Sequence, residues 1–180
     1  MTIATTVIFG LLYPLAVTGL AQILFPVQAN GSLIKNDSGE VIGSTLIGQA
    51  FNSAGYFHGR LSAVSNDAAA SGGSNLGPTS AKLIDRIKAD AEKLQAENPQ
   101  EKVPVELVTT SASGLDPHIS PAAAEFQIPR VAKERNQPAA NIRTVVQQFT
   151  EARQFGLLGD PRVNVLLLNL ELDRKFPLQK

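Results

Sequence analysis

The sequence predicts an α+β, or small α/β, soluble domain attached to one N-terminal transmembrane helix. Residues 3–25 form a nearly unbroken apolar run, and the first charged side chain in the chain is Lys35. A helix rising about 1.5 Å per residue over this run crosses a hydrocarbon core of about 30 Å. Patterns of both strands and helices follow, over a length typical of one domain. We therefore expect an anchor over residues 1–26 and an extracytoplasmic domain over residues 27–180.

A cleaved signal peptide is the alternative to an anchor, because residues 27–29 form a small-x-small triplet ending at Ala29. Signal peptides begin with basic residues and have an apolar core of roughly 7–15 residues. Here no Lys or Arg precedes the run, and the run is longer. The anchor is therefore favoured. A very short N-terminal tail is simplest to leave in the cytoplasm, which places the rest of the chain outside.

Four residues of the apolar run suggest a helix that packs against other membrane helices. Pro14 would break a helix in water, but neighbouring helices can satisfy the freed carbonyl group in a membrane. Gly10 and Gly19 would allow another helix to approach closely. Gln22 could hydrogen-bond to a neighbouring helix or lie at the membrane interface. Ordinary membrane-helix composition explains the same residues equally well.

The soluble part begins with strand patterns and continues with a long loop. Residues 32–43 predict a β-hairpin around a polar, Gly-containing turn. Residues 53–80 lack periodicity, which indicates an ordered functional loop or a partner-contact segment. Thr79 or Ser80 would cap a helix that ends near Glu97 and whose apolar positions share one face. A strand is expected over residues 103–109.

The C-terminal third predicts two helices and a strand. Ser120 followed by proline is a helix start, and Pro129 would break or restart that segment. Pro138 opens an amphipathic helix. Residues 162–173 are apolar nearly throughout and β-branched at their start, which predicts a strand covered on both faces.

Composition excludes several function classes. The formal net charge is zero, so no basic field points to nucleic acid, and the chain has no cysteine. His58 and His118 have no second metal ligand at helical spacing. A hydrolytic set can be written from Ser111 or Ser113, Asp116 and His118, but triads depend on spatial roles that the spacing does not fix. A turn before the helix at residue 120 is the favoured interpretation of residues 116–118.

A Gly-rich segment is the one candidate binding loop. Backbone amides of such a loop can cradle an anion, although the G-K-[ST] ending of a P-loop is absent. A structural turn is therefore the default interpretation. The segment consists of Ser71, Gly72, Gly73, Ser74 and Asn75.

Blocks spread over nearly the whole chain carry a family resemblance. They are residues 13–15, 28–34, 43–44, 46–49, 51, 56–60, 70–76, 103–109, 111–116, 119–132, 163–165, 168–170 and 172–173. In these blocks and in their order, the chain resembles the C subunit of the bacterial Kdp-type potassium-transporting P-type ATPase. One departure is Leu61, where the family usually has proline after the Y-F-H-G-R block.

The resemblance implies a non-catalytic accessory subunit of the bacterial plasma membrane. Its implied partners are a potassium-channel-like A subunit, an ATP-hydrolysing B subunit and a small F subunit. It would stabilise their assembly and act as a chaperone that raises the ATP affinity of the B subunit. It implies no cofactor and no metal of its own, with ATP met only through the partner subunit or a transient ternary complex. Alternatives are direct ATP contact through residues 71–75, or an independent membrane-anchored solute-binding protein.

Overall fold

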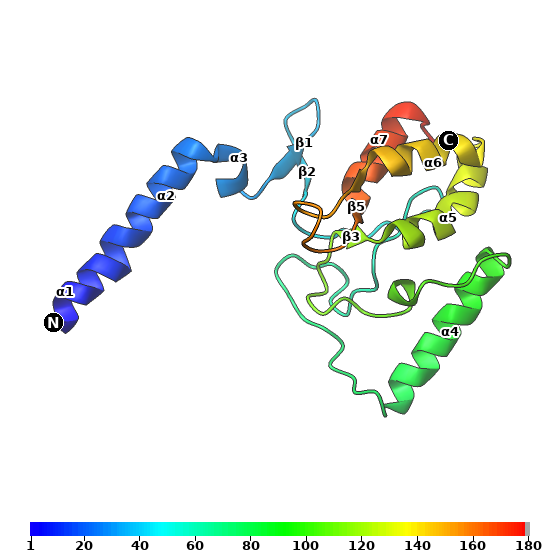
Figure 1. Ribbon diagram of the computed structural model, residues 1–180, viewed down its shortest axis with the longest axis horizontal. Coiled ribbons are helices and arrows are strands. Elements are labelled where there is room, and N and C mark those ends of the chain that lie inside the picture. Colours follow the sequence, from blue (N-terminus) through cyan, green and yellow to red (C-terminus); the bar gives the residue numbers. More distant parts are fainter. Residues whose placement is uncertain (179–180) are drawn as a thin grey trace. The chain divides into compact units, whose positions relative to one another are not determined.

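A computed structural model describes residues 1–178, which group into two compact units (Figure 1). The first unit is Met1–Leu46, and the second begins at Ile47. The first unit contains one long apolar helix and a β-hairpin, whereas the second combines helices with a small sheet. The α+β class with one N-terminal apolar helix is thus confirmed.

The N-terminal helix runs continuously over Thr2–Leu24 and is long and apolar enough to span a membrane. It comprises α1 (Thr2–Val7), the π-helical turn η1 (Ile8–Leu12) and α2 (Tyr13–Leu24). In η1 the amide of Tyr13 donates to the carbonyl oxygen of Ile8, five residues back. Pro14 follows directly and cannot donate. The π turn therefore absorbs the proline without breaking the helix.

The rest of the first unit is a short helix and the predicted hairpin. α3 (Pro26–Ala29) is followed by β1 (Leu33–Lys35) and β2 (Val41–Ser44), which pair antiparallel. The side-chain amides of Gln22 and Asn30 pair with each other, Nδ2 of Asn30 lying 3.1 Å from Oε1 of Gln22. Gln22 therefore has a hydrogen-bond partner within its own chain.

The second unit packs three helices against a small antiparallel sheet with strand order β3-β5-β4 (Figure 1). A fourth helix, α4, extends away from these three. The elements are α4 (Ala81–Glu97), η2 (Val105–Leu107), β3 (His118–Ile119), α5 (Pro121–Glu134), α6 (Ala139–Gln148), β4 (Thr150–Glu151), β5 (Arg162–Asn164) and α7 (Val165–Lys175).

The core of the second unit lies between the three packed helices and the sheet. Fully buried members come from every layer: Phe57, Ile128, Ile142, Val163 and Leu168. By contrast, α4 has no buried residue, although its predicted apolar face is the side that is partly covered. α4 is therefore attached more loosely than the other helices.

Three secondary-structure predictions were right in their boundaries. The hairpin of residues 32–43 is present, the α4 helix ends at the predicted Glu97, and residues 53–80 contain no helix or strand. Ser120 caps α5, its Oγ accepting from the amide of Ala123 at 3.2 Å. Pro138 precedes α6, which is amphipathic as predicted and buries Ile142, Val145 and Val146 on one face.

The strand predicted over residues 103–109 was wrong, because this segment forms the 3-10 turn η2. Leu107 and Val108 are buried consecutively, so burial does not alternate along this segment as it does in a strand with one exposed face. The carboxylate of Glu106 accepts from both the amide and the hydroxyl of Ser120, at 2.8 and 2.6 Å. The turn therefore supports the start of α5.

The break predicted at Pro129 was also wrong, because α5 continues through it. The ring lies on the exposed side of the helix. The carbonyl group left without its donor belongs to Glu125, which is exposed as well. Water can hydrate that carbonyl group, so the cost of the proline is limited.

The long strand predicted over residues 162–173 was wrong beyond its third residue. β5 ends at Asn164, whose Oδ1 accepts from the amide of Leu167 at 3.1 Å and caps α7. The buried residues Val165, Leu168 and Leu172 then recur at helical spacing. An N-cap asparagine inside the apolar run decides the change from strand to helix.

Candidate functional site

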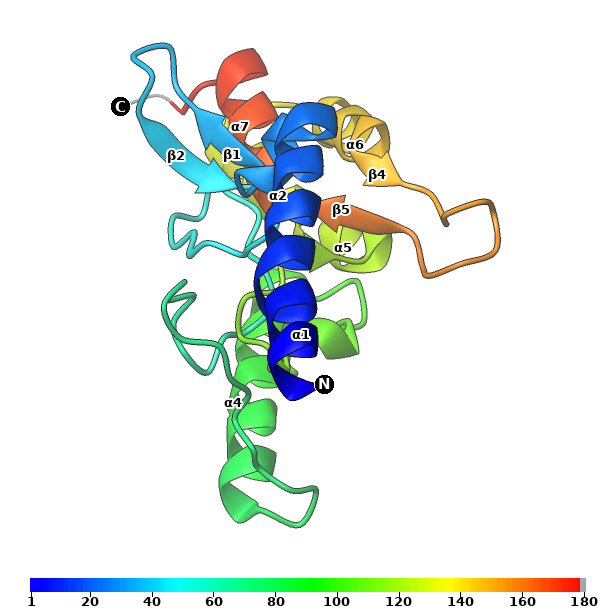
Figure 2. The same ribbon diagram turned by 90° about the vertical axis from the view of Figure 1, so that its left-hand side faces the viewer.

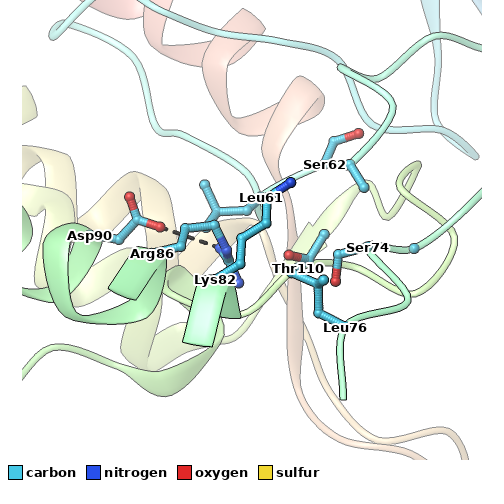
Figure 3. A pocket seen from close by; sticks show the side chains of 10 residues that line it. Leu61, Ser62, Ser74, Leu76, Lys82, Arg86, Asp90 and Thr110 are labelled. Carbon is cyan, nitrogen blue, oxygen red and sulfur yellow. Dashed lines mark hydrogen bonds and ion pairs between the residues drawn. The ribbon is translucent and has the colours of Figure 1, made fainter. Parts of the chain in front are cut away.

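A large cavity of the second unit, of about 490 Å³, lies between α4 and the loop segments that follow residues 60, 72 and 109. Figure 3 shows side chains of α4 on one side and those of Ser74, Leu76 and Thr110 on the other. Its volume falls within the range of about 300–1,000 Å³ typical of small-molecule sites. The lining consists of Leu61, Ser62, Ala63, Gly73, Ser74, Leu76, Lys82, Arg86, Asp90 and Thr110.

The helix α4 contributes the charged side of this cavity. Lys82, Arg86 and Asp90 follow one another at intervals of four residues, so they lie along one stripe of the helix. Nη1 of Arg86 lies 3.3 Å from Oδ2 of Asp90. Lys82 has no ion-pair or hydrogen-bond partner within residues 1–178. The charged side therefore has one internal pair and one unpaired ammonium group.

The guanidinium group of Arg86 is only partly satisfied. Its Nε and Nη2 atoms are buried and have no hydrogen-bond partner in the described part of the chain. A buried donor that is left unmet costs about 1–3 kcal/mol. An acceptor that reached this edge of the guanidinium group would recover that cost.

The structure divides the predicted Gly-rich segment. The amide of Gly72 and the hydroxyl of Ser71 both donate to the carbonyl oxygen of Ser113, at 2.8 and 3.1 Å. Gly73 and Ser74 line the large cavity, whereas Asn75 is exposed with a left-handed φ of 54°. The Gly72 amide is thus already bonded, and only residues 73 and 74 face a space that a ligand could fill.

A smaller cavity of about 100 Å³ adjoins the first and shares Leu61 and Asp90 with it. His58 lies in its wall, and its Nε2 atom is 3.1 Å from the carbonyl oxygen of Ser53. Burial, followed by the positive charge of Arg130, lowers the pKa of His58. His58 is therefore held in its neutral form, with Nε2 in contact with a backbone carbonyl group.

The backbone around His58 is fixed by a buried amide side chain from α5. Gln127 accepts from the amide of His58 at 2.8 Å and donates to its carbonyl oxygen at 3.1 Å. Nη2 of Arg130 donates to Oε1 of the same Gln127 at 2.7 Å, and its Nη1 donates to the carbonyl oxygen of Tyr56 at 3.0 Å. These contacts give the Y-F-H-G-R block a structural role.

The residues of the possible hydrolytic set do not assemble into a triad. The hydroxyls of Ser111 and Ser113 lie 3.2 Å from each other and accept from the amides of Gly114 and Leu115. Asp116 forms the expected turn, its Oδ1 accepting from the amide of His118 at 3.0 Å. Both serine hydroxyls therefore hydrogen-bond to the backbone of their own loop.

Among the described residues, the surroundings of His118 do not form a metal site either. Within residues 1–178, no group of three or more His, Cys, Asp or Glu side chains could hold a metal ion. His118 contacts one carboxylate, with Nδ1 lying 3.8 Å from Oδ1 of Asp116. Burial, followed by the charge of Arg162, lowers the pKa of His118.

Sequence reasoning did not single out the cations of the large cavity. Only the apolar face of this helix was considered in the sequence, although the spacing of Lys82 and Arg86 with Asp90 was a visible signal. An isolated parallel β-bridge between Leu61 and Thr110 brings both residues into the cavity wall. That pairing joins segments 49 residues apart in the sequence, so no local sequence pattern predicts it.

Comparisons with known proteins agree over the whole chain. The model of the KdpC family, described as K+-transporting ATPase, c chain, matches residues 1–174. Potassium-transporting ATPase KdpC subunits from Bradyrhizobium diazoefficiens and Myxococcus xanthus are 58% and 60% identical, each over 97% of this chain and over 93% and 84% of their own lengths. The KdpC subunit of Koribacter versatilis is 54% identical over 99% of this chain and 93% of its own length. The chain therefore belongs to the KdpC family, the c chains of K+-transporting ATPases.

Proposed function

We propose that this chain stabilises the assembly of the potassium-transporting ATPase by packing its N-terminal helix against other membrane subunits. The observation that carries the proposal is the exposure of that helix. No residue of Thr2–Leu24 is buried within the chain, and the run is apolar. Such a surface needs lipid or other helices to cover it.

As a KdpC chain, the protein is a non-catalytic, accessory subunit of a Kdp potassium-transporting ATPase. The proposed partners are the channel-like A subunit, the ATP-hydrolysing B subunit and the small F subunit. The proposed packing positions are Gly10, Pro14, Gly19 and Gln22. Neither glycine would bring an added Cβ into close contact within this chain, which leaves room for a neighbouring helix.

The proposed orientation places the N-terminus in the cytoplasm and residues 27–180 outside the plasma membrane, over the potassium entrance of the A subunit. In this orientation the soluble part cannot reach cytoplasmic ATP. A chaperone effect on the ATP affinity of the B subunit would then be a coupling free energy passed through the membrane subunits. Such couplings are typically about 1–3 kcal/mol.

Direct ATP contact through residues 71–75 is the second candidate. It is favoured by the position of Gly73 and Ser74 on the same cavity as Lys82 and Arg86. The bonded amide of Gly72 and the lack of an aromatic side chain in the cavity wall weigh against it. An independent solute-binding role has the cavity volume alone in its favour.

Replacing the N-terminal helix tests the assembly proposal. Deleting residues 1–25 should prevent recovery of the intact pump. A matched control replaces the same residues with an unrelated, equally long membrane helix, which keeps the tether and removes the specific surface. Recovery of a complete, active complex with the chain that lacks residues 1–25 would refute the proposal. Recovery only with the chain that carries the unrelated helix would show that the native helix acts as a membrane tether and provides no specific packing surface.

Labelling a single introduced cysteine separates the two candidates, because the chain has no cysteine of its own. Ser74→Cys should react with a membrane-impermeant thiol reagent in intact cells. Ala89→Cys, on an exposed position of α4, controls for limited access at residue 74, and Thr2→Cys should react only after permeabilisation. Labelling of Ser74→Cys and Ala89→Cys only in permeabilised cells would favour direct ATP contact.

A further inference from the structure

Hydrogen-bonding groups without partners converge on the large cavity from three separate segments. The ammonium group of Lys82 and the Nε and Nη2 atoms of Arg86 come from α4. The hydroxyls of Ser74 and Thr110 come from two loop segments, and neither hydroxyl bonds to any of the described residues. Figure 3 shows these four side chains around one space. The cavity wall thus offers donors from several directions.

The balance of these groups defines the chemistry of a ligand. Asp90 is the single carboxylate of the lining and pairs with Nη1 of Arg86, which leaves the wall with one net positive charge. The Nε and Nη2 atoms of a guanidinium group present two parallel N–H donors, which match the two oxygens of a carboxylate or a phosphate. A ligand that satisfies the wall is rich in acceptors and carries a negative charge.

The remaining lining limits the body of the ligand. Leu61, Ala63 and Leu76 supply apolar surface beside the cations. No aromatic side chain is present in the lining to stack on a nucleobase, and the described residues hold no carboxylate cluster for the magnesium ion that accompanies a triphosphate. The site therefore suits a small, partly apolar group with one charged end.

We propose that this cavity binds a singly charged oxyanion group, held by the Nε–Nη2 edge of Arg86 and the ammonium group of Lys82. Ser74 and Thr110 complete its hydrogen bonds. The group can come from a small carboxylate or phosphate in solution, or from the phosphodiester of an anionic lipid headgroup. This site does not depend on the accessory role proposed above, because it is built within the second unit alone.

Titration of the full chain in phosphatidylcholine nanodiscs tests this proposal. The amide NMR signals of Ser74 and Thr110 are followed while sodium acetate or inorganic phosphate is added at constant ionic strength. A parallel arm compares nanodiscs with and without phosphatidylglycerol. We expect a saturable shift of both signals in the soluble-anion arm, the lipid arm or both, and the arm that responds identifies the source of the oxyanion.

Matched variants decide whether the shift belongs to this cavity. Lys82→Gln and Arg86→Gln should each weaken binding by about tenfold or more. Lys88→Gln changes an exposed lysine of the same helix outside the cavity and should bind as the unchanged chain does. Far-UV circular dichroism and the remaining amide signals report whether each variant stays folded.

Three results would overturn the proposal. One is the absence of a saturable shift in every arm. Another is a shift that Lys82→Gln and Arg86→Gln leave unchanged, or that Lys88→Gln weakens equally, because general surface charge then explains it. The third is saturable binding of ATP without binding of acetate, phosphate or phosphatidylglycerol, which would assign the cavity to a nucleotide.

Discussion

The side-chain amide of Asn169 holds the backbone of Phe57 at both of its polar groups. Oδ1 of Asn169 accepts from the amide of Phe57, and Nδ2 donates to its carbonyl oxygen, both at 2.9 Å. Both residues are almost completely buried, with exposed fractions of 1% and 0%. The pairing replaces the strand partner that Phe57 lacks, and Gln127 does the same for His58. Two helices thereby fix a loop in place.

Replacing Asn169 with alanine should therefore lower the free energy of unfolding by about 2–4 kcal/mol. Two buried backbone groups of Phe57 lose their partners, and each costs about 1–3 kcal/mol when unmet. Urea denaturation of the full chain in detergent, followed by tyrosine fluorescence, measures the change. Asn141→Ala, at an exposed position of α6, serves as the control and should change stability by less than about 0.5 kcal/mol. Equal losses in the two variants would contradict this structural role.

Arg135 should be a second determinant of stability. Its buried guanidinium group donates to the carbonyl oxygens of Gly55 and Phe176 and to Asp173 at 2.7–2.8 Å, and it lies 5.0 Å from the ring centre of Tyr56. Arg135→Gln leaves several of these acceptors unpaired and should cost about 2–4 kcal/mol. Arg135→Lys should recover only part of this loss, because an ammonium group cannot span three separated acceptors.

The same denaturation measurement checks the Arg135 variants. Arg174→Gln is the matched control, because Arg174 is an arginine of α7 that also pairs with a carboxylate but is 72% exposed in its pair with Glu171. Exposed pairs of this kind contribute about 0–1 kcal/mol. Full recovery by Arg135→Lys would show that charge alone, rather than the geometry of the guanidinium group, is needed at this position.

Stability should fall as the pH drops from neutral towards 5. Burial lowers the pKa of both His58 and His118 in the folded chain, so the unfolded chain binds more protons below about pH 6.5. The free energy of unfolding therefore decreases as pH falls through that value and continues to decrease until the lower folded pKa is passed. His58→Gln should reduce this dependence in denaturation experiments at pH 7.5 and 5.5. A wild-type chain that gained stability over this interval would contradict both pKa directions.

Pro129→Ala should stabilise the second unit by about 1–3 kcal/mol. A proline in a helix interior is about 3 kcal/mol less favourable than alanine, and the new amide would reach the carbonyl group of Glu125. The exposed position of Pro129 means that little packing is lost. Thermal denaturation would show the gain as a raised midpoint. A lower midpoint would mean that the proline ring has a packing role that its exposure does not reveal.

Sequence reasoning predicted elements whose signals are local. The hairpin, the Ser120 cap and the amphipathic face of α6 depend on neighbouring residues, and all three are present. The strand prediction over residues 162–173 was wrong beyond β5, because a continuous apolar run fits the spacing of a strand and of a helix equally well. There, the side chain of Asn164 caps a helix, and its bond to Leu167 decides the outcome.

Only part of the candidate site could be predicted from the sequence, because its residues come from segments that meet only in the folded chain. Gly73 and Ser74 belong to a segment whose composition marked it, whereas Lys82 and Arg86 become cavity residues only when α4 packs beside Leu61. Gln127 and Asn169, which hold the backbone of His58 and Phe57, are polar positions within buried helix faces. Their partners lie 69 and 112 residues away in the sequence. Contacts of that range follow from tertiary packing, so a local pattern does not contain them.

The two glycines of the membrane helix allow the assembly proposal to be tested one face at a time. Gly10 and Gly19 are nine positions apart, so they point to different sides of the helix. An added Cβ meets only ordinary contact with Thr6 at Gly10, and nothing within 4 Å at Gly19. We therefore expect Gly→Leu at either position to leave the helix and its tether intact. At least one of Gly10→Leu and Gly19→Leu should reduce co-purification of the other subunits several-fold, because close helix approach requires a small residue. Leu20→Ile controls for a change of shape without added volume. Co-purification of both glycine variants at the wild-type level would mean that neither glycine lies at a close helix contact.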